Sequence, residues 1–205
     1  MHLKDIYWYY PDIVPKRHCD YIVKHATENF EEKIGATQWD DDKLKERIQK
    51  GDKKAVAKQQ KIRKSSVKFF DDEWVYRLIR GPINAANVRA EWNFDFTWFQ
   101  SCQFTIYKTQ GYYNWHRDTN PETSKTMIRK ISASLLLSEP DEYEGGDFEF
   151  KLQNMKGNAC IRKVTETLHK GSMIVFPSHL FHRVKPVLKG IRHSLVIWGC
   201  GPYFK

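Results

Sequence analysis

A histidine and an aspartate two residues apart, His116 and Asp118, offer one imidazole and one carboxylate for metal binding. On an extended chain both side chains point to the same face, because successive side chains alternate. With a second histidine from a distant strand they would form the three-ligand set that holds non-haem iron(II). Such a set leaves neighbouring positions open for a bidentate 2-oxo acid and for O₂. From the spacing alone, a surface loop with a chance pair of residues is the commoner explanation, so the third ligand decides.

Three histidines near the C-terminus compete for that third position. His179 follows a Pro-Ser pair and is expected in a turn, and His193 falls on the strand face opposite the other candidate residues. His182 begins a predicted strand and is our choice. We therefore predict a metal site built from His116, Asp118 and His182.

An arginine ten residues beyond His182 is the second chemical signal. Period two puts Arg192 on one strand face with Ser194 and Trp198. We interpret His182 and Arg192 as neighbours across a hairpin whose turn is 186–190. A cation on an otherwise apolar face needs an anionic partner, because an unpaired buried charge is very costly. We predict that Arg192 holds the distal carboxylate of 2-oxoglutarate through a bidentate pair, with a structural salt bridge as the alternative.

The first third of the chain is expected to be helical. One predicted helix covers residues 15–30 and begins at Pro15, since proline is tolerated at the first helical position. Asp71 and Asp72 are expected to cap a second helix that is broken or restarted at 81–82 and continues towards Ala90. The apolar stripe of the first helix consists of Cys19, Ile22, Val23, Ala26 and Phe30.

From about residue 98 the pattern changes to period two. In 102–107 the side chains of Gln103, Thr105 and Tyr107 alternate with apolar ones. Further predicted strands are 131–137, 147–151, 159–165, 172–176, 182–185 and 192–198, each bounded by Gly, Pro, Asn or Asp. We predict an α+β, mainly β fold: a double-stranded β-helix, or jelly roll, of residues 98–205, with residues 1–97 as a helical layer packed on it in one structural domain.

Composition limits the class of protein. A chain of 205 residues with 40% hydrophobic and 14% aromatic residues is not disordered. It has no apolar run of about 18 residues, so no membrane span is expected. Its four cysteines form no CxxC pair, which excludes the usual zinc-finger spacings and indicates free thiols in a reducing compartment. A cytoplasmic location is the default expectation.

The net charge of +9 is concentrated in residues 43–68. We favour a solvated helix followed by a mobile loop for this stretch, while nucleic acid, an acidic protein or an anionic small substrate remain compatible with the charge.

Three ordered motifs in 103–198 closely resemble the prolyl 4-hydroxylase-like branch of the 2-oxoglutarate/Fe(II) oxygenase superfamily. They are Tyr107…Gly111-Tyr-Tyr113-x-x-His116-x-Asp118, Tyr143-Glu-Gly145-Gly146-Asp-Phe-Glu-Phe150 and His182-x-Val184-x-Pro186-Val-x-x-Gly190-x-Arg192…Trp198. That branch includes collagen prolyl and lysyl hydroxylases, hypoxia-type prolyl hydroxylases and bacterial PKHD-type hydroxylases. The N-terminal part is also similar to small bacterial or phage-encoded members.

The resemblance implies roles for further residues. Tyr107 corresponds to a tyrosine that hydrogen-bonds the co-substrate carboxylate, and Val184, Ser194 and Trp198 match positions that line the 2-oxoglutarate pocket. Tyr113 matches an aromatic residue at the pocket mouth. Arginine at 192 resembles the lysyl, hypoxia-type and PKHD-type enzymes, since collagen prolyl hydroxylases have lysine there. AlkB-type nucleic-acid demethylases carry arginines further beyond the last histidine, which argues against a base demethylase.

By the same resemblance we expect an enzyme that uses Fe(II), 2-oxoglutarate and O₂, and in some cases ascorbate, to hydroxylate a C–H bond while forming succinate. A prolyl residue in a protein or peptide is the expected substrate, with a free amino acid or other small molecule as the alternative. Gln103, Arg63 and Tyr113 are our substrate-side candidates, and 40–68 and 120–129 the expected substrate-binding segments. The contrasting hypothesis is a non-catalytic cupin-like or nucleic-acid-binding module.

Overall fold

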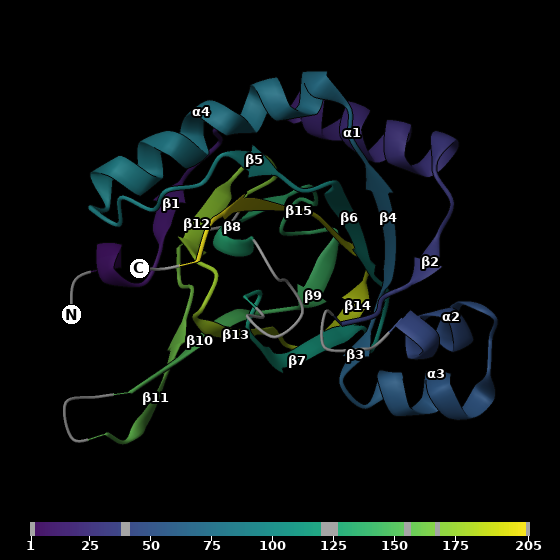
Figure 1. Cartoon of the computed structure of the whole chain (residues 1–205). Coiled ribbons are helices and arrows are strands. Elements are labelled where there is room, and N and C mark those ends of the chain that lie inside the picture. Colours follow the sequence, from purple (N-terminus) through teal and green to yellow (C-terminus); the bar gives the residue numbers. More distant parts are fainter. Residues whose placement is uncertain (1–2, 38–41, 120–126, 154–156, 167–168, 204–205) are drawn as a thin grey trace.

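The computed structural model describes residues 3–37, 42–119, 127–153, 157–166 and 169–203. Two antiparallel β-sheets lie face to face, and helices cover the outer face of the larger one (Figure 1). This is the mainly β, α+β architecture that period two predicts for the second half of the chain. No helix in the described ranges is long and apolar enough to cross a membrane.

The larger sheet contains the strands of Tyr107 and Arg192, the two residues expected to bind the co-substrate carboxylate. Alternation is as expected: the odd-numbered residues of β6 face the space between the sheets, whereas Phe104 packs into the core beneath the helices. Among the described residues its strands, in spatial order, are β1 (Trp8–Tyr10), β12 (Met173–Pro177), β8 (Ile128–Leu136), β15 (Arg192–Gly201), β6 (Cys102–Tyr107), β4 (Ser66–Phe70) and β2 (Lys33–Ile34), with β5 (Trp98–Phe99) paired to β15.

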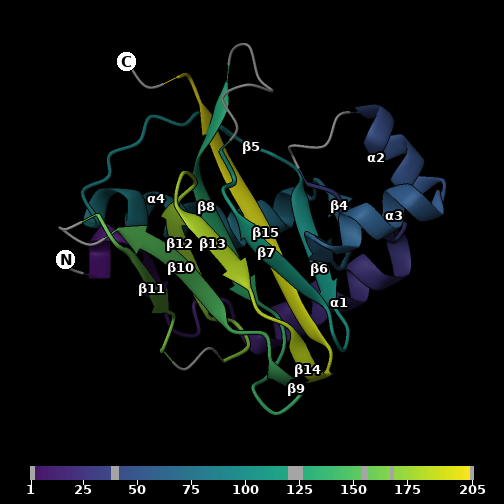
Figure 2. The same cartoon turned by 90° about the horizontal axis from the view of Figure 1, so that it is seen from below.

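The smaller sheet carries the histidines. In spatial order its strands are β11 (Ala159–Lys163), β10 (Phe148–Gln153), β13 (Phe181–Val184), β7 (Tyr112–His116) and β3 (Arg63–Lys64). His182 on β13 is the direct cross-strand partner of His116 on β7, so the pairing itself brings two imidazoles together. Figure 2 shows this sheet crossing in front of β15.

The predicted hairpin between His182 and Arg192 is wrong. Val187–Gly190 forms a strand of its own, β14, which pairs with β9 (Tyr143–Gly145). The chain thereby crosses from the smaller sheet to the larger one between the two residues (Figure 2). His182 and Arg192 consequently approach the same space from opposite sheets, not from neighbouring strands.

Two helices, α1 (Lys16–Asn29) and α4 (Glu73–Arg89), pack on the outer face of the larger sheet (Figure 1). Pro15 precedes α1 with an extended backbone (ψ 139°), so it does not occupy the first helical position as expected. Its carbonyl instead accepts hydrogen bonds from the amides of His18 and Cys19.

The interruption expected at 81–82 is also wrong, because α4 is one helix with Pro82 inside it. Proline removes one helical hydrogen bond, but Ile79 and Ile83 on either side of it are buried against the sheet and hold the helix together. Nor does Asp72 cap α4 with its side chain. The Asp71 carboxylate accepts hydrogen bonds from Tyr76 and from Ser101 beyond the helix.

The basic stretch is more ordered than expected. It contains two short helices, α2 (Asp42–Gln49) and α3 (Lys53–Gln60), which lie beside β2 and β3 (Figure 1). A separate short helix, η1 (Leu3–Asp5), lies near the N-terminus. Asp52 caps α3 by accepting hydrogen bonds from two backbone amides of its first turn. The stretch then continues into β3 and β4, so the mobile loop is replaced by sheet pairing. Residues 40–41 and 120–126 of the expected substrate-binding segments lie outside the described residues.

Candidate metal and co-substrate site

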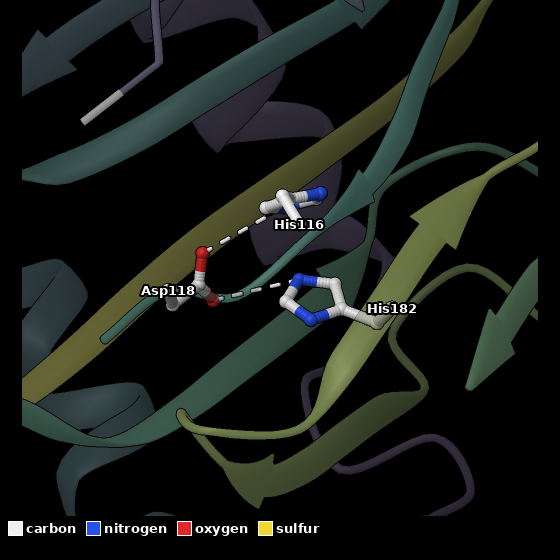
Figure 3. A group of neighbouring side chains, drawn as sticks. All are labelled: His116, Asp118 and His182. Carbon is white, nitrogen blue, oxygen red and sulfur yellow. Dashed lines mark ion pairs between the residues drawn. The ribbon is translucent and has the colours of Figure 1, made fainter. Parts of the chain in front are cut away.

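His116, Asp118 and His182 lie together between the two sheets, each of them buried. One ligand atom from each lies within 4.8 Å of the others. The Nε2 atoms of His116 and His182 are 3.7 and 3.6 Å from the two carboxylate oxygens of Asp118, and all three side chains converge (Figure 3). Two imidazole nitrogens and one carboxylate on one side of a cavity can hold an iron(II) ion.

Backbone carbonyls set the orientation of both imidazoles. His116 Nδ1 lies 2.8 Å from the Asn114 carbonyl, and His182 Nδ1 lies 3.0 Å from the Leu180 carbonyl. A carbonyl can only accept a hydrogen bond, so each Nδ1 must carry the proton. Each Nε2 is then free to bind a metal, and burial, with a further contribution from His182, holds the pKa of His116 well below its ordinary value.

Asp118 is fixed by a short hydroxyl chain. Burial by itself raises the pKa of Asp118, but the two neighbouring imidazoles, Arg129 and a hydrogen bond outweigh it and lower the pKa. That hydrogen bond is donated by Ser132 Oγ to Asp118 Oδ2 over 2.8 Å. Ser132 Oγ also lies 2.8 Å from Ser178 Oγ, and the Asp118 amide donates to the Ser178 carbonyl. The carboxylate is therefore kept ionised and pointed at the two histidines.

A pocket of about 660 Å³ opens beside the three residues, and Arg192 lines it. Arg192 is only 2% exposed, and its Nε and Nη1 atoms have no hydrogen-bond partner among the described residues. Tyr107 is its cross-strand partner, with the guanidinium carbon 5.7 Å from the ring centre. A buried guanidinium with two unpartnered nitrogen atoms fits an anionic ligand such as the distal carboxylate of 2-oxoglutarate.

Gly146 leaves room for the stem of that arginine. Its φ of 66° is a conformation that favours glycine, and a Cβ atom there would come within 2.9 Å of Arg192 Cδ. The double glycine noted in the sequence thus permits a close approach at the co-substrate end of the pocket.

The other predicted co-substrate residues gather in the same pocket. Val184 comes from the smaller sheet, and Ser194 and Trp198 come from the same face of β15 as Arg192. Gln103 also lines the pocket and donates a hydrogen bond to Thr105. The competing histidines lie elsewhere: His179 is exposed, and His193 stacks on Phe104 on the opposite face of β15.

Tyr113 and Arg63 form a stack on the metal side of the pocket. The Tyr113 ring lies parallel to His116 with ring centres 3.4 Å apart, and the Arg63 guanidinium lies 4.5 Å from the centre of the Tyr113 ring. Both residues line the pocket, as the substrate-side interpretation requires.

Sequence reasoning missed Arg129 and the serine chain. Arg129 lines the pocket, lies with its guanidinium carbon 3.6 Å from the centre of the Trp198 ring, and donates through Nε to Gln100. The signal for Ser132 was available, since Ser132 and Ser134 alternate with the apolar residues Ile131, Ala133 and Leu135 along β8.

A sequence model of the 2OG-Fe(II) oxygenase superfamily matches residues 102–199. A PKHD-type hydroxylase of Parvibaculum lavamentivorans is 37% identical over 100 residues, and another from Teredinibacter turnerae is 33% identical over 99 residues. Each alignment covers 47% of this chain and 41% of the relative, so the chain spans about two fifths of the length of these proteins.

Two solved structures resemble the whole fold. A Pseudomonas putida prolyl-4-hydroxylase has a TM-score of 0.64 at 17% identity, covering 95% of this chain and 92% of that one. A viral collagen prolyl hydroxylase from Paramecium bursaria Chlorella virus-1, in complex with 2OG, has a TM-score of 0.63 at 18% identity, covering 96% of both chains. At such identities the likeness shows the fold, which is the double-stranded β-helix predicted from the sequence.

Proposed function

This chain belongs, through residues 102–199, to the 2OG-Fe(II) oxygenase superfamily, and from that premise we propose that it is a dioxygenase that hydroxylates a prolyl residue of a protein or peptide. The observation that carries the proposal is the convergence of two features in one pocket. The His116–Asp118–His182 cluster offers three ligands, and Arg192 offers unpartnered donors beside it. Neither feature alone would indicate a 2-oxo acid as co-substrate.

In this proposal His116, Asp118 and His182 hold iron(II), and Arg192 with Tyr107 binds the distal carboxylate of 2-oxoglutarate. Bound iron(II) supplies the activation of O₂ that couples decarboxylation of 2-oxoglutarate to hydroxylation. The chain's own residues orient the participants. Arg192 fixes one end of the co-substrate, so that the 2-oxo end meets the metal side of the pocket in a single orientation.

Water exclusion is the second contribution of the chain. Phe148 and Phe176 surround His182, with ring centres 5.4 and 4.8 Å from its imidazole. Val184 and Trp198 continue this apolar lining towards Arg192. A dry lining strengthens the pairing between guanidinium and carboxylate and protects a reactive oxidant from solvent.

The prolyl substrate is supported by relatives rather than by a contact in this chain. Several of the resembling solved structures are named prolyl hydroxylases, and one of them, from Trichoplax adhaerens, is in complex with a hypoxia inducible factor peptide. The pocket extends beyond the metal residues, since Trp98 and Met127 also line it. A cytoplasmic location is proposed because Cys19, Cys102 and Cys200 are buried free thiols.

The test begins with the purified chain loaded anaerobically with iron(II). We expect it to bind 2-oxoglutarate and, on admission of O₂ and a co-expressed proteome, to release succinate while adding one oxygen atom to proline in particular peptides, as detected by mass spectrometry. Omission of ascorbate tests whether turnover requires it. Oxygen added only to free amino acids would replace the peptide substrate with a small molecule. Failure to bind 2-oxoglutarate would contradict the oxygenase proposal itself.

A further inference from the structure

The pocket contains more positive charge than the metal and the co-substrate need. Among the described residues that line it, Arg63, Arg129 and Arg192 are cationic deep inside, while Asp118 is the lone acid. Lys33 and Lys45 also line it, but each has a neighbouring carboxylate within 4.0 Å. The three arginines form no ion pair among the described residues.

A charge balance of the assembled site isolates two of these arginines. The two positive charges of iron(II) and the one on Arg192 equal the two negative charges of 2-oxoglutarate and the one on Asp118. The site proposed above is therefore neutral once it is filled. Arg63 and Arg129 then remain as uncompensated cations in a pocket where an unpaired charge is costly.

Arg63 has a donor left over for a ligand. It is only 3% exposed, and it donates through Nε to Ser65 Oγ at 2.7 Å and through Nη1 to the Ala36 carbonyl at 2.9 Å. Its Nη2 atom is buried and has no hydrogen-bond partner among the described residues. The two bonds that are made hold the guanidinium rigidly against the Tyr113 ring. A neutral protein partner could have satisfied Nη2, so the vacant donor points to a ligand.

Arg129 lies near enough to Arg63 for the two charges to interact. Burial lowers the pKa of Arg129, Asp118 opposes that shift, and Arg63 makes a smaller contribution that lowers the pKa further. Two cations that disfavour each other across a pocket are both stabilised when an anion enters between or beside them. Without such an anion, stacking on Trp198 and the hydrogen bond to Gln100 hold Arg129 in the pocket.

We propose that the substrate carries a carboxylate close to the hydroxylated atom, and that Arg63, through Nη2, is the residue that recognises it, with Arg129 as the second cation. The inference rests on the proposed function and narrows its substrate to polypeptides with aspartate or glutamate beside the target residue. A carboxylate suits Arg63 because one of its oxygens can accept a hydrogen bond from the unpartnered Nη2 group. The remaining oxygen is available to Arg129.

The test measures binding, with no turnover. The full chain is loaded with manganese(II) and saturated with N-oxalylglycine, and the probes are N-acetyl-aspartate N-methylamide and its asparagine isostere. Paramagnetic broadening of the probe protons reports binding near the metal even when it is weak, and zinc(II)-loaded protein is the diamagnetic control. We expect the acid to bind about tenfold more tightly than the amide, as one hydrogen bond between charged groups implies.

Variants assign the effect to Arg63. Arg63→Gln should remove the preference for the acid, while Lys64→Gln, which deletes an equal charge from the exposed neighbour on β3, should retain it. Thermal unfolding checks that both variants fold. If Arg63→Gln does not fold, the comparison of acid and amide on the unmodified chain still tests the inference. Arg63→Gln should leave the affinity for 2-oxoglutarate within about threefold of the original, because Arg192 holds that carboxylate.

Several outcomes would overturn the inference. They are equal broadening of acid and amide, no broadening of the acid, an acid preference that survives Arg63→Gln, and a loss of 2-oxoglutarate affinity in Arg63→Gln. Tighter binding of free aspartate than of the capped form would contradict the polypeptide source. An acid preference without any hydroxylation product would support this inference and contradict the proposed function. The two failures can therefore be distinguished.

Discussion

Replacing Arg192 with methionine should have opposite effects on the apo protein and on its response to 2-oxoglutarate. In the apo protein the change removes a buried guanidinium with two unpartnered nitrogen atoms and leaves an apolar chain of similar length. We therefore expect the variant to be at least as stable as the original protein without ligand, because no intramolecular partner is left unsatisfied.

The co-substrate response should be nearly lost. Two hydrogen bonds between charged groups, at about 1.5 kcal/mol each as the low end of the usual range, correspond to a roughly 150-fold rise in Kd. At a 2-oxoglutarate concentration about 100 times the original Kd, binding stabilises the original protein by about 2.7 kcal/mol and the variant by about 0.3 kcal/mol. For a chain of this size the first figure is a Tm increase of about 5–10 °C and the second is about 1 °C.

Thermal unfolding of manganese(II)-loaded protein with and without 2-oxoglutarate measures both effects. Arg192→Lys, which keeps the charge but loses the planar fork, should give an intermediate response. Lys189→Met is the matched control, since Lys189 is an exposed cation on β14 whose partner is Glu144. An Arg192→Met protein that 2-oxoglutarate still stabilises by several degrees would refute the assignment and point to another cation as the anchor.

Three further outcomes are expected. His182→Ala should abolish binding of iron(II) in an anaerobic titration, whereas His179→Ala should retain it, because only the first side chain faces the cluster. Ser132→Ala, which removes the donor to Asp118, should weaken metal binding by about tenfold or more in the same titration. Burial lowers the pKa of His116, so below about pH 6.5 the unfolded chain takes up a proton at this residue that the folded apo protein does not. The free energy of unfolding measured in urea should therefore fall from pH 7 to pH 5, by up to about 1.4 kcal/mol per pH unit from this group. The fall should be less steep in His116→Gln.

The alternation of side chains predicted which residues of β6 and β15 line the pocket, because these two strands pair in regular register from Arg192 to Val196. Tyr107 and Arg192 are register partners, and alternation from each correctly put Gln103, Ser194 and Trp198 in the pocket. A strand buried on both faces still shows its polar residues at every second position, and those residues identified the functional face.

Pairing partners could not be read in the same way. The segment 186–190 contains Pro and Gly at its ends, which is the usual mark of a turn, and the hairpin prediction followed from it. In the structure Val187 pairs with Gly145, more than forty residues earlier, so the decision between turn and strand depended on a distant segment. The helix through Pro82 is a similar case, because burial against the sheet outweighed the local preference.

Arg129 shows most clearly why one of the three arginines of the pocket could not be predicted from the sequence. Alternation along β8 assigns Arg129 to the same face as Ile131, which packs under the helices. The register with β15 shifts between Gly199 and Cys200, so that Lys130 is an extra residue opposite that step. Such a bulge re-aims the side chains beyond it, and here it turns a cation from the helix-covered face into the pocket over Trp198. The position of Arg129, the second cation that we propose for substrate recognition, thus depends on a backbone irregularity.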